Sequence, residues 1–215
     1  MTIWLLGGTG PEGRGLAIRF ALSGESTIIG SRDKDRAEAT AHKMCDQYGI
    51  DNIGAGNNLE VAKQAEILFI AVPYIAQREL LASLENVLKY KIVVNTVVPL
   101  AFHDGMPYLL DIEDGSASVE SQILLPDSKV VSALQTVSAR DLANIEENMI
   151  GDVIVCSDYE DAKMEIMHKI DSIPDFRVLD GGRLANSRYV ESITAMLLNL
   201  NSKYKTRSGI RITGI

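Results

Sequence analysis

The amino-acid sequence predicts an α/β protein with a doubly wound, mostly parallel sheet and a small C-terminal α/β extension. Two observations lead to this prediction. Short apolar runs, such as residues 2–6 and 26–30, contain few polar residues, as expected for strands buried on both faces of a sheet. These runs alternate with helical patterns along the chain, which favours parallel strands joined by right-handed helical crossovers.

The turn after the first apolar run has the spacing of a dinucleotide-binding loop. Glycines at positions 8, 10 and 13 form the pattern G-x-G-x-x-G between a predicted strand and a predicted helix. In the Rossmann fold, these glycines permit a tight turn, close approach of a pyrophosphate, and close packing of the helix on the strand. The amides that open the helix then point at the phosphates. We therefore assign six residues of this loop to a cofactor: Gly8, Thr9, Gly10, Pro11, Glu12 and Gly13.

The end of the second predicted strand indicates which dinucleotide binds. A site for NAD usually has an acidic residue there, which binds the ribose 2′-hydroxyl. This chain instead has Ser31 and Arg32, with Arg36 shortly beyond. A guanidinium forms two parallel charge-assisted hydrogen bonds with a phosphate group. We therefore expect NADP(H), and we expect Asp33 to cap the following helix.

The remaining elements follow from the same patterns. Further strands are expected at 52–58, 66–72, 91–95, 129–134, 152–156 and 176–179. Helices are expected at 34–48, 59–65, 75–88, 118–125, 159–171 and 186–201. The segment 101–115 is expected to be a long functional loop. We divide the chain into a dinucleotide-binding domain, residues 1–155, and a small C-terminal segment packed on it, residues 156–215.

Composition limits the partners and the compartment. A net charge of −8 argues against nucleic acid or an anionic membrane surface as a partner. The sequence has no signal peptide pattern and no apolar stretch near the ~20 residues of a membrane-spanning helix. Cys45 and Cys156 form neither a metal-binding pattern nor a disulfide framework. We expect a cytoplasmic protein without a bound metal.

Familiar catalytic groups are sparse. The three histidines are His42, His103 and His168, and only His103, in the long loop, merits a test. There is no Tyr-x-x-x-Lys pair and no paired-carboxylate motif. Reduction of a ketone needs a proton donor, whereas hydride exchange between two cofactors needs mainly close alignment of the reacting carbons. The sequence therefore favours transfer between two cofactors.

Four segments resemble the NADP oxidoreductases that use the deazaflavin coenzyme F420. They are LLGGTGPEGRGLAIRFALSG with IIGSRDKDRAEA, KIVVNTVVPL, KVVSALQTVSA and LDGGRLANSRYVESIT, in the family's order. The resemblance implies an oxidoreductase that transfers a hydride between NADP(H) and coenzyme F420, mainly by positioning the two. It implies that Thr9, Ser31, Arg32 and Arg36 hold the adenosine phosphates.

The resemblance also implies which residues line the nicotinamide and the deazaflavin. The expected contacts are Val72, Pro73, Tyr74, Val98, Pro99 and Ala139. No catalytic residue is certain, and the candidates are Gln135, Thr136, Ser192 and Thr194. For the last three, packing at the end of a helix or strand is an equally good reading.

The chain departs from the family at the second cofactor. Gln135 replaces a histidine; it can donate a hydrogen bond to a deazaflavin carbonyl but cannot titrate. Val137-Ser138 replaces an X-Pro turn, and Leu100-Ala101-Phe102 lacks the family's basic residue. These changes leave two alternatives: an NADPH-dependent reductase of a flavin, quinone or small carbonyl or imine, and a non-catalytic NADP sensor. The apolar last helix, with Ile193, Met196, Leu197 and Leu200, suits a dimer or an interdomain contact, and we expect a homodimer.

Overall fold

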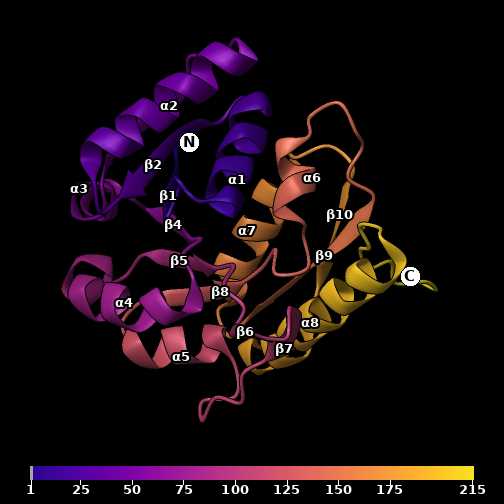
Figure 1. Ribbon diagram of the computed structural model, residues 1–215. Helices are drawn as coiled ribbons and strands as arrows, with labels where there is room; N and C mark the ends of the chain where they lie inside the picture. Colours follow the sequence, from indigo (N-terminus) through magenta and orange to yellow (C-terminus); the bar gives the residue numbers. More distant parts are fainter. Residues whose placement is uncertain (1) are drawn as a thin grey trace.

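Eight strands form one sheet in the computed structural model, which describes residues 2–215 (Figure 1). The strand order is β10-β9-β8-β5-β4-β1-β2-β3. The bounds are β1 (Thr2–Leu6), β2 (Ser26–Ser31), β3 (Ile53–Asn57), β4 (Ile67–Ile70), β5 (Ile92–Asn95), β8 (Lys129–Ser132), β9 (Gly151–Ser157) and β10 (Phe176–Asp180). All neighbours are parallel except β8 and β9. The predicted doubly wound, mostly parallel sheet is therefore confirmed.

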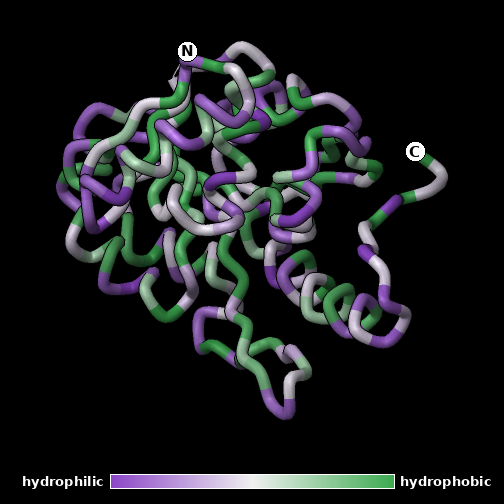
Figure 2. Tube along the Cα trace, turned by 45° about the horizontal axis from the view of Figure 1, so that its top comes forward, coloured by the Kyte–Doolittle hydropathy of each residue, from purple (hydrophilic) through white to green (hydrophobic). Residues whose placement is uncertain are grey.

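Helices cover both faces of the sheet. One face packs against α1 (Pro11–Leu22), α2 (Lys34–Tyr48), α6 (Ala139–Ala143) and α7 (Glu160–Asp171). The other face packs against α3 (Asn58–Gln64), α4 (Tyr74–Leu88), α5 (Ala117–Leu124) and the short 3₁₀ helix η1 (Leu184–Asn186). The last helix, α8 (Ser187–Tyr204), follows η1. Figure 2 shows hydrophobic and hydrophilic residues alternating along α8, as expected for a helix with one buried side.

Local sequence explains where the first helices begin and end. The Asp33 side chain accepts a hydrogen bond from the Arg36 amide and so caps α2, as predicted. The same helix ends at Gly49, which has the left-handed conformation that glycine adopts without strain. Asn57 and Glu60 form a reciprocal capping box at the start of α3. These signals explain why the predicted and observed bounds of α2 agree.

The expected long loop contains a β-hairpin. Strands β6 (Leu100–His103) and β7 (Met106–Leu109) pair in antiparallel register and turn at Asp104-Gly105, both with positive φ. Asp-Gly is a favoured pair for such two-residue turns. The prediction of a loop was wrong because the strands are short and mostly solvent-exposed, which leaves a weak alternating pattern. The hairpin lies beside α8, where the Asn199 amide donates to the Pro107 carbonyl (2.9 Å).

Helix α6 was also missing from the predicted elements. It packs on α1 at Gly15, where an added Cβ would lie 2.5 Å from the Leu142 Cβ. Arg19 of α1 donates to the Asp141, Leu142 and Asn144 carbonyls near the end of α6. These contacts hold the segment after β8 against the helix that follows the glycine loop.

The C-terminal part of the chain extends the same sheet. Residue 155 lies within β9, which pairs with β8 on one side and β10 on the other. The division into residues 1–155 and 156–215 stays a prediction. Beyond α8 the chain runs in an extended path to the C-terminus (Figure 2). Within residues 2–215, no helix is long and apolar enough to cross a membrane.

A buried carboxylate attaches this last segment to the sheet. Asp152 is 2% exposed and accepts hydrogen bonds from the Arg177 guanidinium (2.9 and 2.6 Å) and from the Ile212 amide (2.6 Å). The hydrogen bonds from Arg177 lower the pKa of Asp152 despite its burial. The ionised form is therefore the one that stabilises the fold.

We predict that Asp152→Asn lowers the free energy of unfolding at pH 7 by about 1.5–3 kcal/mol, the usual value of a charged hydrogen bond. The lowered pKa means that this stabilisation is complete above the pKa of Asp in the unfolded chain, ~3.9, and is lost as the pH falls through the folded value. Urea unfolding at pH 7 and at low pH measures both effects. Asp158→Asn, which removes an exposed pair with Arg183, is the control and should cost under about 1 kcal/mol. Equal losses for both variants would contradict the prediction.

Candidate cofactor site

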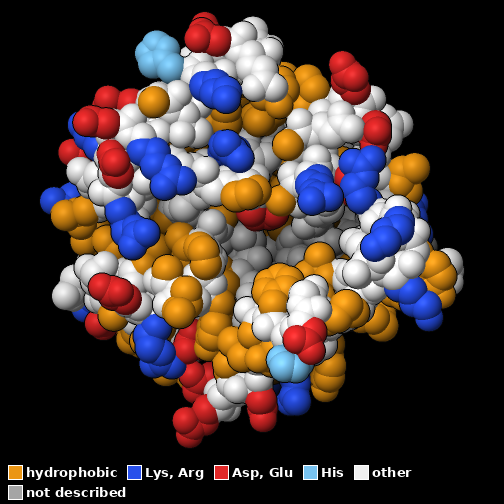
Figure 3. Space-filling view, viewed as in Figure 1, with side chains coloured by type: hydrophobic (Ala, Val, Ile, Leu, Met, Phe, Trp, Pro, Cys, Tyr) orange, Lys and Arg blue, Asp and Glu red, His pale blue; other side chains and the backbone are white. Residues whose placement is uncertain are grey.

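The predicted site residues follow strands that end at one edge of the sheet. The carboxyl ends of β1, β2, β4, β5 and β8 meet there because these strands are parallel. The strand order reverses between β1 and β4, and ligands of open α/β sheets bind at such a switch point. Figure 3 shows a hollow at the centre of this view, with lysine and arginine side chains on both sides of it.

The glycine loop brings the start of α1 into contact with the end of β1. A Cβ on Gly13 would lie 2.6 Å from the Gly7 carbonyl oxygen and from the Gly8 Cα, both backbone atoms. A Cβ on Gly8 would lie 2.4 Å from the Ile29 Cβ of β2. Gly10 occupies the N-cap position without a side-chain cap, so the first-turn amides have no side-chain acceptor. The loop therefore presents its amides at the positive end of a helix dipole.

The cations expected for a 2′-phosphate lie just after β2. Ser31 is buried, and its hydroxyl accepts a hydrogen bond from the Asp33 amide (3.2 Å). Arg32 and Arg36 are exposed, and within residues 2–215 neither guanidinium forms an ion pair. Asp33, the residue after Arg32, accepts a hydrogen bond from the Arg36 amide as the cap of α2. Both guanidinium groups are therefore available to an anion.

The segment after β4 lies directly against the glycine loop. A Cβ on Gly7 would meet the Ala71 carbonyl oxygen at 2.5 Å and the Val72 Cγ1 at 2.7 Å. Pro73 is exposed and immediately precedes α4. Tyr74 turns toward α5, where its hydroxyl contacts the Glu120 carboxylate (3.4 Å). Burial and this carboxylate raise the pKa of Tyr74, so it stays protonated at neutral pH.

A buried polar network lies beneath the edge. Glu120 is 3% exposed and accepts hydrogen bonds from Gln77 (2.9 Å) and Arg78 (2.5 Å). Asn95, the last residue of β5, donates to Gln77 (2.9 Å) and to Ser121 (2.6 Å). Its side-chain oxygen accepts from the Val97 amide (2.7 Å). The network fixes the turn that leads to Val98, half-buried, and Pro99, buried.

The side chain of Gln135 is oriented by this network. Its Nε2 donates to the Asn95 carbonyl (2.9 Å) and to the Ser132 hydroxyl (2.7 Å). Its Oε1 is buried and has no hydrogen-bond partner. The expectation that Gln135 donates to a deazaflavin carbonyl stays a prediction, and it requires the amide nitrogen to leave one of these two acceptors. The remaining polar atom of the side chain, Oε1, is an acceptor covered by protein atoms.

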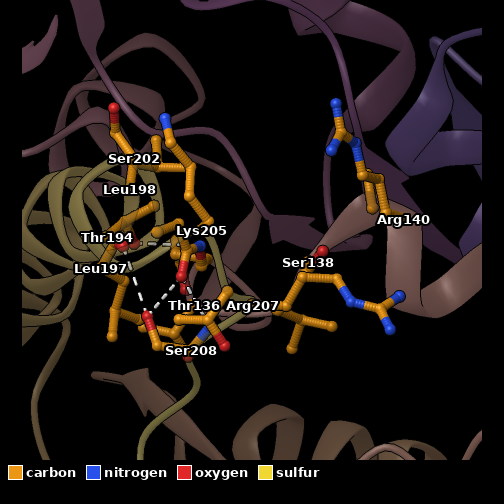
Figure 4. A pocket seen from close by; sticks show the side chains of 15 residues that line it. Thr136, Ser138, Arg140, Thr194, Leu197, Leu198, Ser202, Lys205, Arg207 and Ser208 are labelled. Carbon is orange, nitrogen blue, oxygen red and sulfur yellow. Dashed lines mark hydrogen bonds between the residues drawn. The ribbon is translucent and has the colours of Figure 1, made fainter.

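A cavity of about 950 Å³ opens between the segment after β8 and helix α8. Its lining includes four predicted residues, Gln135, Thr136, Ala139 and Thr194. The Thr194 hydroxyl donates to the Gln135 carbonyl (2.9 Å), which joins the two walls. Figure 4 shows Thr194, Leu197 and Lys205 grouped on one side, with Arg140 apart from them.

Ser192 is not part of this cavity. Its side chain is exposed and its hydroxyl donates to the Arg188 carbonyl one helical turn earlier (2.6 Å). The histidines are equally remote from it: His42 and His168 are exposed on helices, and His103 is exposed on the hairpin beside Asp104 (3.5 Å). The structure therefore brings together three of the four candidate catalytic residues.

Two features of the C-terminal segment around this cavity were not predicted from the sequence. Lys205 and Arg207 line the cavity, and Arg207 pairs with Asp141 (2.8 Å) and Glu147 (2.5 Å). The basic tail at residues 203–211 was visible in the sequence, but its path back along the 135–140 segment was not.

The second unpredicted feature is the buried Glu191 of α8. It accepts hydrogen bonds from the Ala117 and Ser118 amides (2.9 and 3.2 Å) and from the Ser118 hydroxyl (2.9 Å). It thereby attaches α8 to the start of α5. Burial raises the pKa of Glu191 to about 7, and these hydrogen bonds oppose the rise. A single carboxyl on an amphipathic helix gives no sequence signal of such a contact.

The arrangement suits two ligands side by side. Loop amides and two unpaired guanidinium groups offer hydrogen-bond donors to an anion on one side, and the cavity beside α8 has a lining of mixed polarity. Within residues 2–215 no group of His, Cys, Asp and Glu could hold a metal ion. The predicted contacts that follow β4 and β5, Val72, Val98 and Pro99, are apolar.

Comparisons with known proteins agree with this geometry. A family model described as NADP oxidoreductase, coenzyme F420-dependent, matches residues 2–99. The F420-dependent NADP reductase of Methanothermobacter marburgensis is 37% identical over 225 residues, which covers 100% of this chain and 99% of that protein. The F420-dependent NADP reductase of Methanocaldococcus jannaschii is 40% identical, with coverage of 100% and 99%.

Solved structures extend the likeness to the whole fold. A protein from Arthrobacter sp. FB24, assigned as an F420-dependent NADP reductase, superimposes with a TM-score of 0.86, 26% identity and full coverage of both chains. Pyrroline carboxylate reductase of Plasmodium falciparum, solved with NADP bound, shares the fold at a TM-score of 0.62 and 13% identity, over 95% of this chain and 64% of that one. Sequence identities of 37% and 40% to the two Methanothermobacter and Methanocaldococcus reductases extend over the whole chain. They show that this chain belongs to the family of F420-dependent NADP reductases.

Proposed function

We propose that this protein transfers a hydride between NADP(H) and coenzyme F420 by holding both in the cleft at the carboxyl edge of the sheet. The observation that carries this proposal is the pairing of an anion-binding glycine loop with a second cavity between Gln135 and α8. Full-length identity to F420-dependent NADP reductases supports the choice of acceptor.

The residues of the first side fit a phosphorylated dinucleotide. The amides after Gly10 would receive the pyrophosphate, and Ser31, Arg32 and Arg36 would receive the 2′-phosphate. Val72, Pro73 and Tyr74 would border the nicotinamide side. The fit rests on the close approach of Gly13 to backbone atoms and on two guanidinium groups without partners.

The second side would hold the deazaflavin. Val98, Pro99 and Ala139 would supply apolar contacts, while the Thr136 hydroxyl would offer a polar one. NADPH supplies the hydride when bound, and the protein's own task is to align the acceptor and exclude water. Thr194 contributes by fixing the Gln135 backbone. A reaction that depends on alignment of the two cofactors does not need a histidine that acts as a general acid.

Assembly and compartment are part of the same proposal. Exposed apolar side chains gather on α8 and the adjoining hairpin: Phe102 (66% exposed), Tyr108 (47%), Tyr189 (62%) and Met196 (55%). Such a surface suits the interface of a homodimer. Cys45 and Cys156 are free thiols, as is usual in the reducing cytoplasm.

Addition of NADPH to the protein with oxidised F420 should remove the visible absorbance of the deazaflavin. Riboflavin, a quinone and a cyclic imine serve as rival acceptors in the same assay. We expect F420 to be reduced with the highest kcat/KM. A protein that binds NADPH but reduces a rival faster would contradict the proposed acceptor, and turnover of none of them would favour a non-catalytic role.

Arg32→Glu should weaken NADPH binding far more than NADH binding. A carboxylate in place of the guanidinium loses a charged hydrogen bond to the 2′-phosphate, about 1.5–3 kcal/mol, which is at least about tenfold in Kd. Fluorescence titration measures both constants. Lys34→Glu makes the same charge change beside it, at a side chain paired with Glu60, and should have a much smaller effect. Equal weakening of NADPH and NADH by Arg32→Glu would place the 2′-phosphate elsewhere.

Met196→Lys should convert the homodimer into a monomer, because it introduces a charge into the apolar surface of α8 and the hairpin. Sedimentation velocity should give twice the chain mass for the wild-type protein and the single mass for the variant. Met164→Lys is the matched control: Met164 is equally exposed (55%) but lies on α7. A monomeric wild-type protein would refute the proposed assembly.

A further inference from the structure

One carboxyl group in the first turn of α1 has no partner. Glu12 is the second residue of α1, directly between Gly10 and Gly13 of the glycine loop. The residue is half-buried, its Oε1 atom is completely covered, and Oε1 makes no hydrogen bond. No ion pair involves Glu12 among residues 2–215. An acidic side chain without a donor or a cation is unusual at a covered position, because burial of an unpaired charge is costly.

Charges on the neighbouring elements do not neutralise this carboxyl. Among the elements packed on α1, strands β1, β2 and β3 carry no ionisable side chain. Helix α6 carries Arg140, which is exposed, and Asp141, which pairs with Arg207. Helix α1 itself carries two basic residues. Arg14 is exposed, and Arg19 donates to the carbonyls near the end of α6. None of these groups provides a counter-ion for Glu12.

Burial therefore decides the protonation state of Glu12. Loss of solvent raises the pKa of this carboxyl to about 8, and no nearby charge contributes to the shift. An acidic residue in the first turn of a helix is ordinarily stabilised in its ionised form by the helix dipole. Here desolvation outweighs that effect. At neutral pH, Glu12 is a neutral carboxylic acid that can donate one hydrogen bond.

The location of Glu12 opposes an ionised carboxylate when a dinucleotide binds. The first-turn amides of α1 are the groups that receive the pyrophosphate in the proposed function, and Glu12 belongs to that turn. A buried carboxylate would repel the phosphates in a medium that screens poorly. A neutral carboxylic acid removes the repulsion and supplies a donor.

We propose that Glu12 is the proton-carrying group of the cofactor site, so that NADP(H) binds to the form with a neutral Glu12 and its binding takes up a proton from solvent above neutral pH. This inference rests on the proposed NADP(H) site. It adds a linkage between pH and cofactor affinity that neither the glycine motif nor the cations after β2 contain. The covalent change is a single protonation: water or buffer loses H⁺ and the Glu12 carboxylate gains it.

The linkage predicts two measurable quantities. With a pKa near 8, half of the free protein carries an ionised Glu12 at pH 8, so NADPH binding should take up about half a proton per site. Above pH 8, the Kd for NADPH should rise, approaching about tenfold per pH unit. Below pH 7, the Kd should become independent of this group. The 2′-phosphate titrates near pH 6 and does not contribute above pH 8.

Calorimetry in buffers with different ionisation enthalpies measures the proton uptake directly on the wild-type protein. Fluorescence titration with NADPH between pH 7 and pH 9.5 measures the affinity, on the wild-type protein, on Glu12→Gln and on Glu12→Leu. We expect uptake near half a proton at pH 8 for the wild-type protein and none for the variants, with a Kd independent of pH in both variants. NADH, which lacks the 2′-phosphate, should show the same uptake.

Two results would overturn the inference. The first is NADPH binding to the wild-type protein without proton uptake at pH 8. The second is a wild-type pH dependence that persists in Glu12→Gln. Neither result touches the proposed hydride acceptor, because no F420 is present in the experiment. A wild-type protein that binds no NADPH at any pH would instead refute the proposed function, and this inference with it.

Discussion

The cleft of this protein depends on the contact between Gly13 and the backbone of Gly7 and Gly8. Any side chain at residue 13 would approach two backbone atoms at 2.6 Å, so only glycine lets α1 begin so close to the end of β1. This approach directs the first-turn amides toward the switch point between β1 and β4. Glu12 belongs to the same turn, and its Oε1 atom is covered. The proposed anion site and the unpaired carboxyl therefore share the turn whose position Gly13 permits.

A polar network supports the opposite side of the cleft. Hydrogen bonds run from Glu120 through Gln77 and Asn95 to Gln135, and Glu191 attaches α8 to the start of α5. These contacts fix where the segments after β5 and β8 leave the sheet. A reaction that needs two rings held close and aligned benefits from such fixed walls more than from an acid or base. Membership of the F420-dependent NADP reductases agrees with this design.

Local patterns were sufficient for the parallel sheet, because most of its strands, such as β1, β4 and β5, are short apolar runs. The glycine loop and the cap of α2 by Asp33 could also be predicted from local sequence. The hairpin at Leu100–Leu109 was missed because its strands are short and exposed. The orientation of Gln135 and the return of Arg207 to the cavity depend on contacts between segments far apart in the sequence. No local pattern encodes such contacts.

In the proposed function, the two cofactors exchange a hydride directly within one cleft. NADPH that carries deuterium at the transferred position of nicotinamide C4 tests this claim, with mass spectrometry of the reduced F420 as the readout. Both C4 stereoisomers are used, so that transfer from either face of the nicotinamide is detected. Direct transfer predicts that one isomer delivers its deuterium to F420 in full, in ordinary water. Reduced F420 that contains no deuterium from either isomer would mean that the hydrogen exchanges with solvent, which would contradict direct transfer between the two bound cofactors.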